Sequence, residues 1–427
     1  MREDLLHFIW KYKKLQLQNL VTTRDESLVI IDPGSHNLQS GPDFFNAKIN
    51  IDGQLWAGNV EVHPNASDWY VHHHEEDVAY DNVILHVVWH DDINVYRKDN
   101  SLIPTLELKR YVSEDLLKSY KGLFENRSNK FINCENGIST VDKFTVRNWF
   151  ERLYIERLEQ KSELVNTLLK SSNNDWEKVL FMLLLKNFGL NINGASFLTI
   201  AHALDYSIVR KLRNDHFQLE SVFFGLAGLL DYNKIKDPYF DSLKKEYAYL
   251  RKKFDLTQES VQRPEFFKLR PTNFPTIRLS QIAALYEEHE NLFQKVIKAP
   301  GLDDLYAIFD ISASRYWDIH FTFGKESKKS PKKLTKPFID LLLINTILPL
   351  KFCYAHHKGT DGIVGIFSII ERIKKEDNSI LNKFKAIGVQ VKTAGDTQAI
   401  LQLYNEYCSK NKCLQCAIGS SLLHGNI

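Results

Sequence analysis

Hydrophobic and polar positions alternate along the first part of the chain, a pattern typical of β-strands with one buried face. A helix is predicted over residues 2–19, where Leu5 and Phe8 begin a helical spacing. Another short helix is expected near residue 70, capped by Ser67 or Asp68. Runs rich in β-branched and aromatic residues predict strands at 27–32, 44–52, 54–63, 82–90 and 104–111. The predicted order is therefore a helix, three strands, a short helix and further strand.

The turn between the second and third strand runs carries the clearest local signal. Asp52 and Gly53 separate two alternating stretches. Both positions of a two-residue hairpin turn need residues that tolerate a positive φ, and this pair does. The two strands are therefore predicted to form an antiparallel hairpin.

The pattern changes near residues 126–129, and from about Val141 hydrophobic positions recur with the period of an α-helix. No fixed-period repeat is evident. We therefore predict an α+β protein with two domains. An α/β domain is expected over residues 1–125, and a large all-α domain, ending in a cysteine-containing segment, over residues 126–427.

The composition is that of an ordinary soluble protein, with 427 residues, 44% hydrophobic and 25% charged. The first residues carry charges where a signal peptide needs an apolar core, and no apolar run is expected to span a membrane. Five cysteines argue against a disulfide framework. We therefore expect a cytoplasmic protein with no membrane segment. The formal charge of +2 neither requires nor excludes a nucleic-acid partner.

Two carboxylates and an imidazole are predicted to meet at one end of the hairpin. Asp43 opens the second strand run, while Glu61 and His63 stand two residues apart near the end of the third run and so share one face. Such a set can hold a hard divalent cation, Mg²⁺ or Mn²⁺, and orient a water molecule on it. Asp43 and Glu61 are therefore the candidate metal ligands.

This arrangement resembles the PD-(D/E)xK nuclease superfamily. Residues 42 and 43 are Pro-Asp, and residues 61–63 read Glu-Val-His where that superfamily has Asp or Glu, any residue and Lys. The resemblance implies a mixed sheet flanked by helices and hydrolysis of DNA or RNA. It also implies metal binding by Asp43 and Glu61, with the residue at position 63 activating or positioning the attacking water. The departure is His63, because histidine can bind a metal or act as a base but carries no permanent charge.

Over nearly its full length, the chain is also identified as a member of an uncharacterised bacterial family, a domain of unknown function. This resemblance is carried by GPDF (41–44), GNVEVH (58–63), SDWYVHHH (67–74), YDNVILHVVWHDD (80–92), RPTNFPTIRLSQ (270–281) and the terminal cysteine segment. The family implies no particular activity.

Further histidines and one glutamate could add metal ligands. Residues 72–74 are consecutive histidines, and on a helix only one of them, His74 by preference, can face the site. His86, on the fourth strand run, fits a core histidine better, and His36 is a weaker loop candidate. Glu3 could join the carboxylates, although a solvated residue at the start of a helix is the simpler interpretation.

Three cysteines near the C-terminus have C-x4-C-x2-C spacing, which suits metal coordination by thiolates: Cys408, Cys413 and Cys416. A closed site needs a fourth ligand, which Cys134, Cys353 or a histidine such as His424 could supply. Some nucleases of the resembled superfamily fix a C-terminal segment with an iron–sulfur cluster, and that resemblance implies Cys134 as the fourth ligand. The open alternatives are a Zn²⁺ ion, such a cluster, or buried free thiols.

A basic and aromatic segment is the candidate nucleic-acid contact. Lys268, Arg270 and Arg278 alternate with phenylalanines there, which suits phosphate pairing and base stacking. A connector between helices, with prolines fixing the turns and phenylalanines packed in the core, is the competing interpretation.

These observations favour a metal-dependent nuclease in which Asp43, Glu61 and His63 are catalytic. One alternative is a catalytically silent nucleic-acid or protein-binding module that keeps the fold. Another is a transition-metal site built from His63, His74 and Glu61. The sequence contains no phosphate-binding loop, dinucleotide fingerprint, nucleophile elbow or H-E-x-x-H motif, so kinase, dehydrogenase and serine-hydrolase functions lack support.

Overall fold

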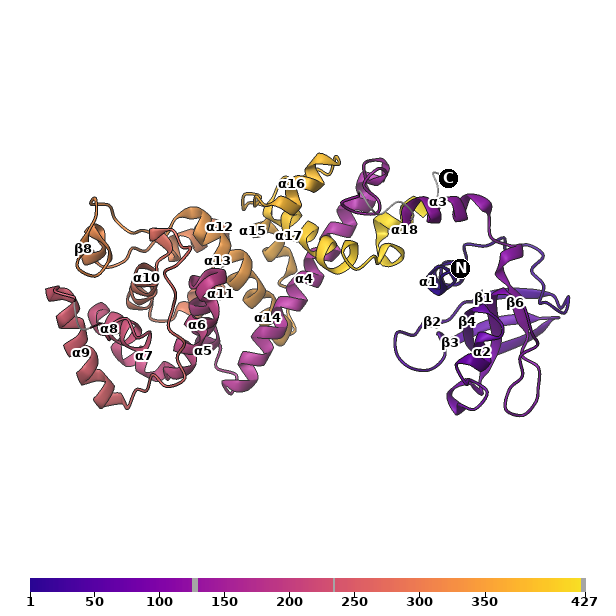
Figure 1. The fold of residues 1–427 in the computed structure, drawn as a ribbon, viewed down its shortest axis with the longest axis horizontal. Coiled ribbons are helices and arrows are strands. Elements are labelled where there is room, and N and C mark those ends of the chain that lie inside the picture. Colours follow the sequence, from indigo (N-terminus) through magenta and orange to yellow (C-terminus); the bar gives the residue numbers. More distant parts are fainter. Residues whose placement is uncertain (125–129, 233–234, 424–427) are drawn as a thin grey trace. The chain divides into compact units, whose positions relative to one another are not determined.

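The computed structural model describes residues 1–124, 130–232 and 235–423, and the chain divides into two compact units (Figure 1). The first unit comprises Met1–Trp149, Lys383–Val389 and Leu403–Ile427, and the second comprises Phe150–Asn382 and Gln390–Gln402. The domain boundary expected between residues 125 and 126 lies outside the described residues. The C-terminal segment, which we expected in the helical domain, groups with the first unit instead.

A mixed β-sheet forms the centre of the first unit (Figure 1). Its strands are β1 (Leu28–Asp32), β2 (Ser35–His36), β3 (Phe44–Ile51), β4 (Gln54–Asn65), β5 (Val83–His90) and β6 (Thr105–Glu107). The order across the sheet is β1-β3-β4-β5-β6, with β2 paired to β3. The pairs β1–β3 and β3–β4 are antiparallel, whereas β4–β5 and β5–β6 are parallel. The α+β class and the predicted order of elements are confirmed, with the two-residue β2 as an addition.

The hairpin predicted at residues 52 and 53 is present. Asp52 and Gly53 have φ values of 49° and 84°. They connect β3 to β4, with Ile51 paired to Gln54 across the turn. Because both turn residues adopt the left-handed region, the register of this hairpin is fixed at its closed end.

The first helix is shorter than the predicted 2–19, and the short helix expected near residue 70 is present. The helices of the first unit are α1 (Glu3–Lys11), α2 (Asp68–Val71), α3 (Glu114–Phe124) and α18 (Ala417–Leu423), with short helical turns at Val78–Tyr80, Leu108–Arg110, Ile138–Thr140, Leu403–Cys408 and Cys413–Gln415. The first helix ends early because Lys13 adopts a φ of 50°. The Nζ of Lys13 donates to the carbonyl oxygens of Ile30 and Ile31, at 3.0 and 2.9 Å. These two hydrogen bonds connect the chain after α1 to β1.

The sheet is buried on both faces along β5 and the second half of β4. On one face, Val60 and Val62 belong to a core that also contains Leu5 and Leu6 of α1. On the other face, a smaller cluster includes Trp69, Tyr80, Val83 and Val88. Because side chains alternate along a strand, Glu61 and His63 point away from the α1 core and toward this smaller cluster. They are only 4% and 2% exposed. Strand β4 therefore places two polar side chains, those of Glu61 and His63, in a buried layer of the first unit.

The second unit is helical, as predicted. Its helices are α5 (Trp176–Phe188), α6 (Leu190–Ala203), α7 (Tyr206–Leu212), α8 (His216–Leu226), α9 (Pro238–Phe254), α10 (Pro275–Glu288), α11 (Leu292–Lys298), α12 (Leu302–Ile308), α13 (Lys336–Leu342), α14 (Leu348–Lys358), α15 (Ile363–Ile370) and α17 (Ala394–Gln402). Two more helices, α4 (Lys143–Ser171) and α16 (Ser379–Ala386), contribute residues to both units. A short hairpin, β7 (His320–Thr322) with β8 (Lys325–Glu326), completes it.

One helical stretch corrects the expectation that no apolar run is long enough to span a membrane. Lys336–Lys358, which joins α13 to α14 through a π-helical turn at Leu343–Ile347, passes that test by length and composition. The sequence argument underestimated it because the turn continues the helix without a break. In the structure, 61% of its apolar window is buried inside the protein.

Candidate metal centre

Asp43 and Glu61 meet where β3 begins and β4 approaches its end. The backbone N–H of Asp43 donates to Oε2 of Glu61 at 3.0 Å. In return, the backbone N–H of Val62 donates to Oδ2 of Asp43 at 3.0 Å. This reciprocal pair holds each carboxylate against the strand that carries the other. The prediction that these side chains converge is confirmed, while their catalytic role stays a prediction.

Imidazoles surround the remaining oxygen of Glu61. Oε1 lies 3.3 Å from Nε2 of His74 and 3.5 Å from Nε2 of His63. Nδ1 of His72 lies 3.2 Å from Nε2 of His63. One ring nitrogen from each of these three histidines lies within 4.8 Å of the others, a separation that a single metal ion could bridge. In the described part of the chain, Nε2 of His74 is buried and makes no hydrogen bond.

His72 and His74 both face the site, which corrects the expectation that only one histidine of the triplet would. Helix α2 ends at Val71, so the histidines are not helical. His73 adopts a φ of 59° between them. This left-handed residue reverses the chain and directs its two neighbours to the same side. A helical reading of the triplet was the source of the error.

His86 contacts Nδ1 of His63, whereas Nε2 of His63 faces Glu61. It is fully buried on β5, opposite Glu61 in the parallel register. Its Nε2 lies 2.9 Å from Nδ1 of His63. Since one of these two nitrogens must carry the proton, the contact ties the tautomer of His63 to that of His86. The prediction that His86 is a core histidine is confirmed.

Helix α1 brings a second group of polar side chains to the site. Nε2 of His7 lies 3.1 Å from Oδ2 of Asp43 and 3.7 Å from Oε1 of Glu3. The possible ligand atoms of Glu3, His7 and Asp43 all lie within 4.8 Å of one another. His7 was not among the sequence candidates. The available signal was its spacing of four residues from Glu3, which places both on one face of the helix. His36 lies beside this group, stacked on Phe44.

The protein environment keeps the central imidazoles neutral. Burial, reinforced by neighbouring histidines, lowers the pKa of His63 to about 2, and burial lowers that of His86 to about 3. Burial also lowers the pKa of His74. Burial and the charge of Asp43 raise the pKa of Glu61 to about 9. The contacts of His63 and His74 with Glu61 are therefore not ion pairs, and the imidazoles keep lone pairs that a metal can accept. A divalent cation would favour the ionised carboxylate and offset its burial cost.

His7 behaves differently from the buried imidazoles. Burial alone would lower its pKa, but the hydrogen bond and charge of Asp43 outweigh burial and raise it. A protonated His7 would partly neutralise Asp43. The site therefore has two sides, a carboxylate-rich side at α1 and an imidazole-rich side at residues 63–74. Oxygen ligands suit Mg²⁺ and Mn²⁺, and imidazoles suit transition metals.

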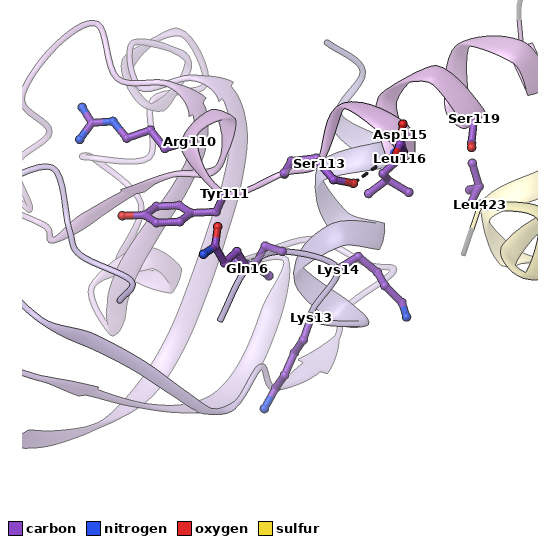
Figure 2. Close-up of a pocket in the computed structure, with 12 residues that line it drawn as sticks. Lys13, Lys14, Gln16, Arg110, Tyr111, Ser113, Asp115, Leu116, Ser119 and Leu423 are labelled. Atoms are coloured by element: carbon purple, nitrogen blue, oxygen red, sulfur yellow. Dashed lines mark hydrogen bonds between the residues drawn. The ribbon is translucent and has the colours of Figure 1, made fainter. Parts of the chain in front are cut away.

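A separate hollow of about 500 Å³ lies in the first unit, between the end of α1 and the start of α3 (Figure 2). Figure 2 shows Lys13, Lys14 and Arg110 on its walls. The candidate metal ligands do not line it. The ammonium group of Lys13 also donates to backbone carbonyls of β1, so it stabilises the fold as well as lining the hollow.

The candidate nucleic-acid residues lie in the second unit, and the structure separates them. Lys268 and Arg270 are exposed. Arg278 is only 5% exposed, with its guanidinium donating to Gln281 and Asn273 at 2.8 and 2.6 Å. Burial lowers its pKa to about 9. This corrects the expectation for Arg278, which is committed to the interior of α10 and is not available to a phosphate.

The cysteines also fall into two sets. Cys353 lies in the second unit, where its thiol donates to Oδ1 of Asn166 at 3.2 Å. The other four lie in the first unit: Cys134, Cys408, Cys413 and Cys416. His424, the other ligand considered, lies outside the described residues. Of the two cysteines considered as a fourth ligand, Cys134 lies in the same unit as the three terminal cysteines and Cys353 does not.

The fold and this site together define a class, an α+β protein whose N-terminal mixed sheet carries one buried and one partly buried carboxylate beside neutral imidazoles. The chain belongs to the family described as "Protein of unknown function (DUF2851)", whose model matches residues 3–379. The expected membership of an uncharacterised family is thus confirmed over residues 3–379, nearly the full chain. Neither the curated proteins nor the solved structures include a significant match to the chain.

Proposed function

We propose that the first unit hydrolyses phosphodiester bonds of DNA or RNA, using a divalent ion bound by Asp43 and Glu61. The observation that carries this proposal is the reciprocal hydrogen bonding of the two carboxylates at the β3–β4 junction. Their backbone partners fix the position of each carboxylate and leave oxygen atoms free for an ion. The order of helix, antiparallel strands, short helix and parallel strand supports the same interpretation, as does the Pro-Asp and Glu-x-His spacing.

The side chains divide the work of such a reaction. Asp43 and Glu61 supply oxygen ligands, and Glu3 extends this set from α1. A bound Mg²⁺ or Mn²⁺ would polarise a phosphate oxygen and lower the pKa of a coordinated water. With a pKa of about 2, His63 is too weak a base to take the proton of that water, but its Nε2 would accept a hydrogen bond from the water and position it, provided that Nδ1 of His63 donates to Nε2 of His86. In this scheme, His86 is a positioning residue that sets the tautomer.

The test is cleavage of labelled single- and double-stranded DNA and RNA with Mg²⁺, Mn²⁺ or EDTA. The wild-type protein is compared with an Asp43→Ala/Glu61→Ala double variant. A Glu114→Ala/Asp115→Ala variant is the matched control, because these two carboxylates are highly exposed on α3. We expect cleavage that requires metal, survives in the control and falls by at least about 10³-fold in the double variant.

Two other results would point elsewhere. No cleavage of any substrate, with equal nucleic-acid binding by the wild type and the double variant, would overturn the proposal and support a silent binding module. Cleavage that persists in the double variant would show that Asp43 and Glu61 are not the metal ligands of the reaction.

A second candidate function is favoured by the group formed by His63, His72 and His74. Three imidazoles with Glu61 form a donor set suited to Zn²⁺ or another transition metal, and they could support hydrolysis of a substrate other than nucleic acid. Tight Zn²⁺ binding that is lost in His72→Ala and His74→Ala, without metal-dependent cleavage of nucleic acid, would favour this candidate.

A further inference from the structure

The outward side of helix α9 carries a dense group of positive charges. In Figure 1, this helix lies beside α8 in the second unit. Its inward side is formed by the buried residues Phe240, Leu243, Tyr247 and Leu250. Five lysine and arginine residues and one glutamate occupy positions 244–253. The exposed cations form the basic face of α9: Lys245, Arg251, Lys252 and Lys253. Because the whole chain carries a formal charge of only +2, this helix concentrates positive charge locally.

The charges of the basic face are not paired within the described part of the chain. None of its four residues forms an ion pair with a carboxylate there. Glu246, the single carboxylate between positions 244 and 253, accepts a hydrogen bond from Nε2 of Gln218 on α8 at 3.1 Å. Asp241 and Asp255 lie at the two ends of α9, in the first turn and directly after the last residue. The basic face is therefore available to an anionic partner.

An exposed aromatic ring lies in the middle of the basic face. Tyr249 is 57% exposed. It follows Lys245 by four residues and precedes Lys252 by three, so the three side chains share one side of the helix. The Nζ of Lys253 lies 5.5 Å from the centre of its ring. A ring that is open to solvent between lysines is suited to stack on a nucleic-acid base.

The end of helix α7 extends this surface. The Nζ of Lys211 lies 5.8 Å from the centre of the Phe254 ring, and the Nζ of Lys253 lies 5.3 Å from the same centre. The last turns of α7 and α9 therefore bring their lysines together. Since an α-helix rises by about 1.5 Å per residue, positions 245–253 span about 12 Å. Phosphates follow one another at about 3.4 Å per strand along a DNA duplex, so this length can contact several of them.

We propose that the basic face of α9, together with Tyr249 and Lys211, binds a single strand of DNA or RNA. The cationic side chains would pair with phosphates, and the ring of Tyr249 would stack on an unpaired base. Phosphates and bases together match both parts of this surface, its charges and its exposed ring. In a duplex the bases are stacked inside, so only the phosphate contacts would remain. The inference rests on the proposed function for nucleic acid as the substrate class, and it adds a binding surface that takes no part in the chemistry.

The test measures binding of the full chain to a fluorescent single strand of about 20 nucleotides, and to a duplex of the same sequence, by fluorescence anisotropy. EDTA is present throughout, so that metal-dependent cleavage does not interfere. The variant of the basic face is Lys245→Ala/Lys252→Ala/Lys253→Ala. The matched control removes the same charge from exposed positions on other elements of the second unit: Lys298→Ala/Lys358→Ala/Lys374→Ala.

We expect the triple variant of the basic face to bind the single strand at least about tenfold more weakly than wild type. Between about 50 and 200 mM salt, the slope of log K against log salt should fall by about 2, because three phosphate contacts are lost. The control should bind like the wild type. Circular dichroism of both variants should match the wild type, since all six lysines are exposed.

Tyr249 provides a second, independent test. We expect Tyr249→Ala to weaken binding of the single strand by about fivefold or more and to leave binding of the duplex unchanged. Tyr249→Phe keeps the ring and should bind like the wild type. Equal weakening for the single strand and the duplex would overturn the stacking role.

Other outcomes would overturn the whole inference. These are wild-type affinity and salt slope in the triple variant of the basic face, or equal losses in that variant and the control. Binding to phosphatidylserine vesicles that is lost in the variant, without binding of nucleic acid by the wild type, would assign the surface to a membrane instead. Because the readout needs neither Asp43 nor Glu61, its failure is distinct from a failure of the proposed cleavage.

Discussion

Glu61 lies where a carboxylate is costly to place, since it is 4% exposed and the imidazole side chains beside it, those of His63 and His74, are neutral. A buried carboxylate without a cationic partner lowers the stability of the fold. The reciprocal bond with Asp43 recovers only part of this cost, because it satisfies one of the two oxygens of Glu61. A bound cation is the simplest partner for the other oxygen.

The sequence predicted that Asp43, Glu61 and His63 lie close together, because the turn of a hairpin determines which positions of its two strands are adjacent. It could not identify His72, because that residue depends on the left-handed conformation of His73. His7 was missed for a different reason. Its position on α1 is visible in the sequence, but its contact with Asp43 depends on how the helix packs on the sheet.

Lys161 on α4 provides a pH-dependent prediction in the second unit. Burial lowers its pKa to about 7, although its Nζ donates to Asn345 and Gln398. Between about pH 7 and its ordinary value of 10.5, the unfolded chain binds a proton that the folded protein does not. The contribution of Lys161 to the free energy of unfolding therefore rises with pH across that window. Below pH 7 the folded protein also holds the proton, so the burial of this charge lowers stability to its full extent there.

We predict that the stability of a Lys161→Met variant relative to wild type will decrease steadily as pH rises from 7 to 10. Urea unfolding at three pH values measures this difference. The exposed Lys170, on the same helix, gives a matched Lys→Met control whose difference should stay constant. A stability difference between Lys161→Met and wild type that does not vary with pH would show that burial does not lower the pKa of Lys161.

At the scale of elements, the strands were predictable and the helix ends were not. Runs rich in β-branched and aromatic residues located β1, β3, β4 and β5 within two residues of their observed bounds. The end of α1 was predicted too late, because spacing alone does not reveal that Lys13 turns the chain back toward β1. Contacts made later in the chain decided where that helix stops.

The parallel pairing of β4 with β5 depends on Gly58. A Cβ at this position would lie 2.5 Å from Cγ2 of Ile84 and 2.7 Å from the carbonyl oxygen of Asn82. We predict that Gly58→Ala will destabilise the protein by about 1–3 kcal/mol and weaken metal binding, because β4 carries Glu61. Gly122→Ala on α3 is the control. It has open space around it and should stabilise by up to about 1 kcal/mol. Equal effects of the two substitutions on urea unfolding would contradict this account.

At the scale of the whole molecule, the sequence correctly predicted a sheet-containing part followed by helices. It did not show that residues 403–423 return to the first unit, because nothing local marks a contact with residues about 280 positions earlier.

The returning segment contributes to the core of the first unit, and this leads to a stability prediction. Leu414 is 8% exposed and packs in the cluster that contains Leu5 and Leu6. We predict that Leu414→Ala will lower the free energy of unfolding by about 2–3 kcal/mol. The same substitution at Leu38, which is 81% exposed, should change it by less than about 0.5 kcal/mol. Chemical denaturation that shows no difference between the two variants would place the segment outside the core.

The central claim is that Asp43, Glu61 and the adjacent imidazoles form a metal centre, and a Mn²⁺ titration followed by the electron paramagnetic resonance of the free ion tests it most directly. Wild-type protein is compared with Glu61→Gln, which keeps the shape of the side chain and can still accept from the Asp43 N–H. The account predicts saturable Mn²⁺ binding in the wild type that weakens by at least about tenfold in the variant. Equal binding by both proteins, or no binding by the wild type, would contradict it.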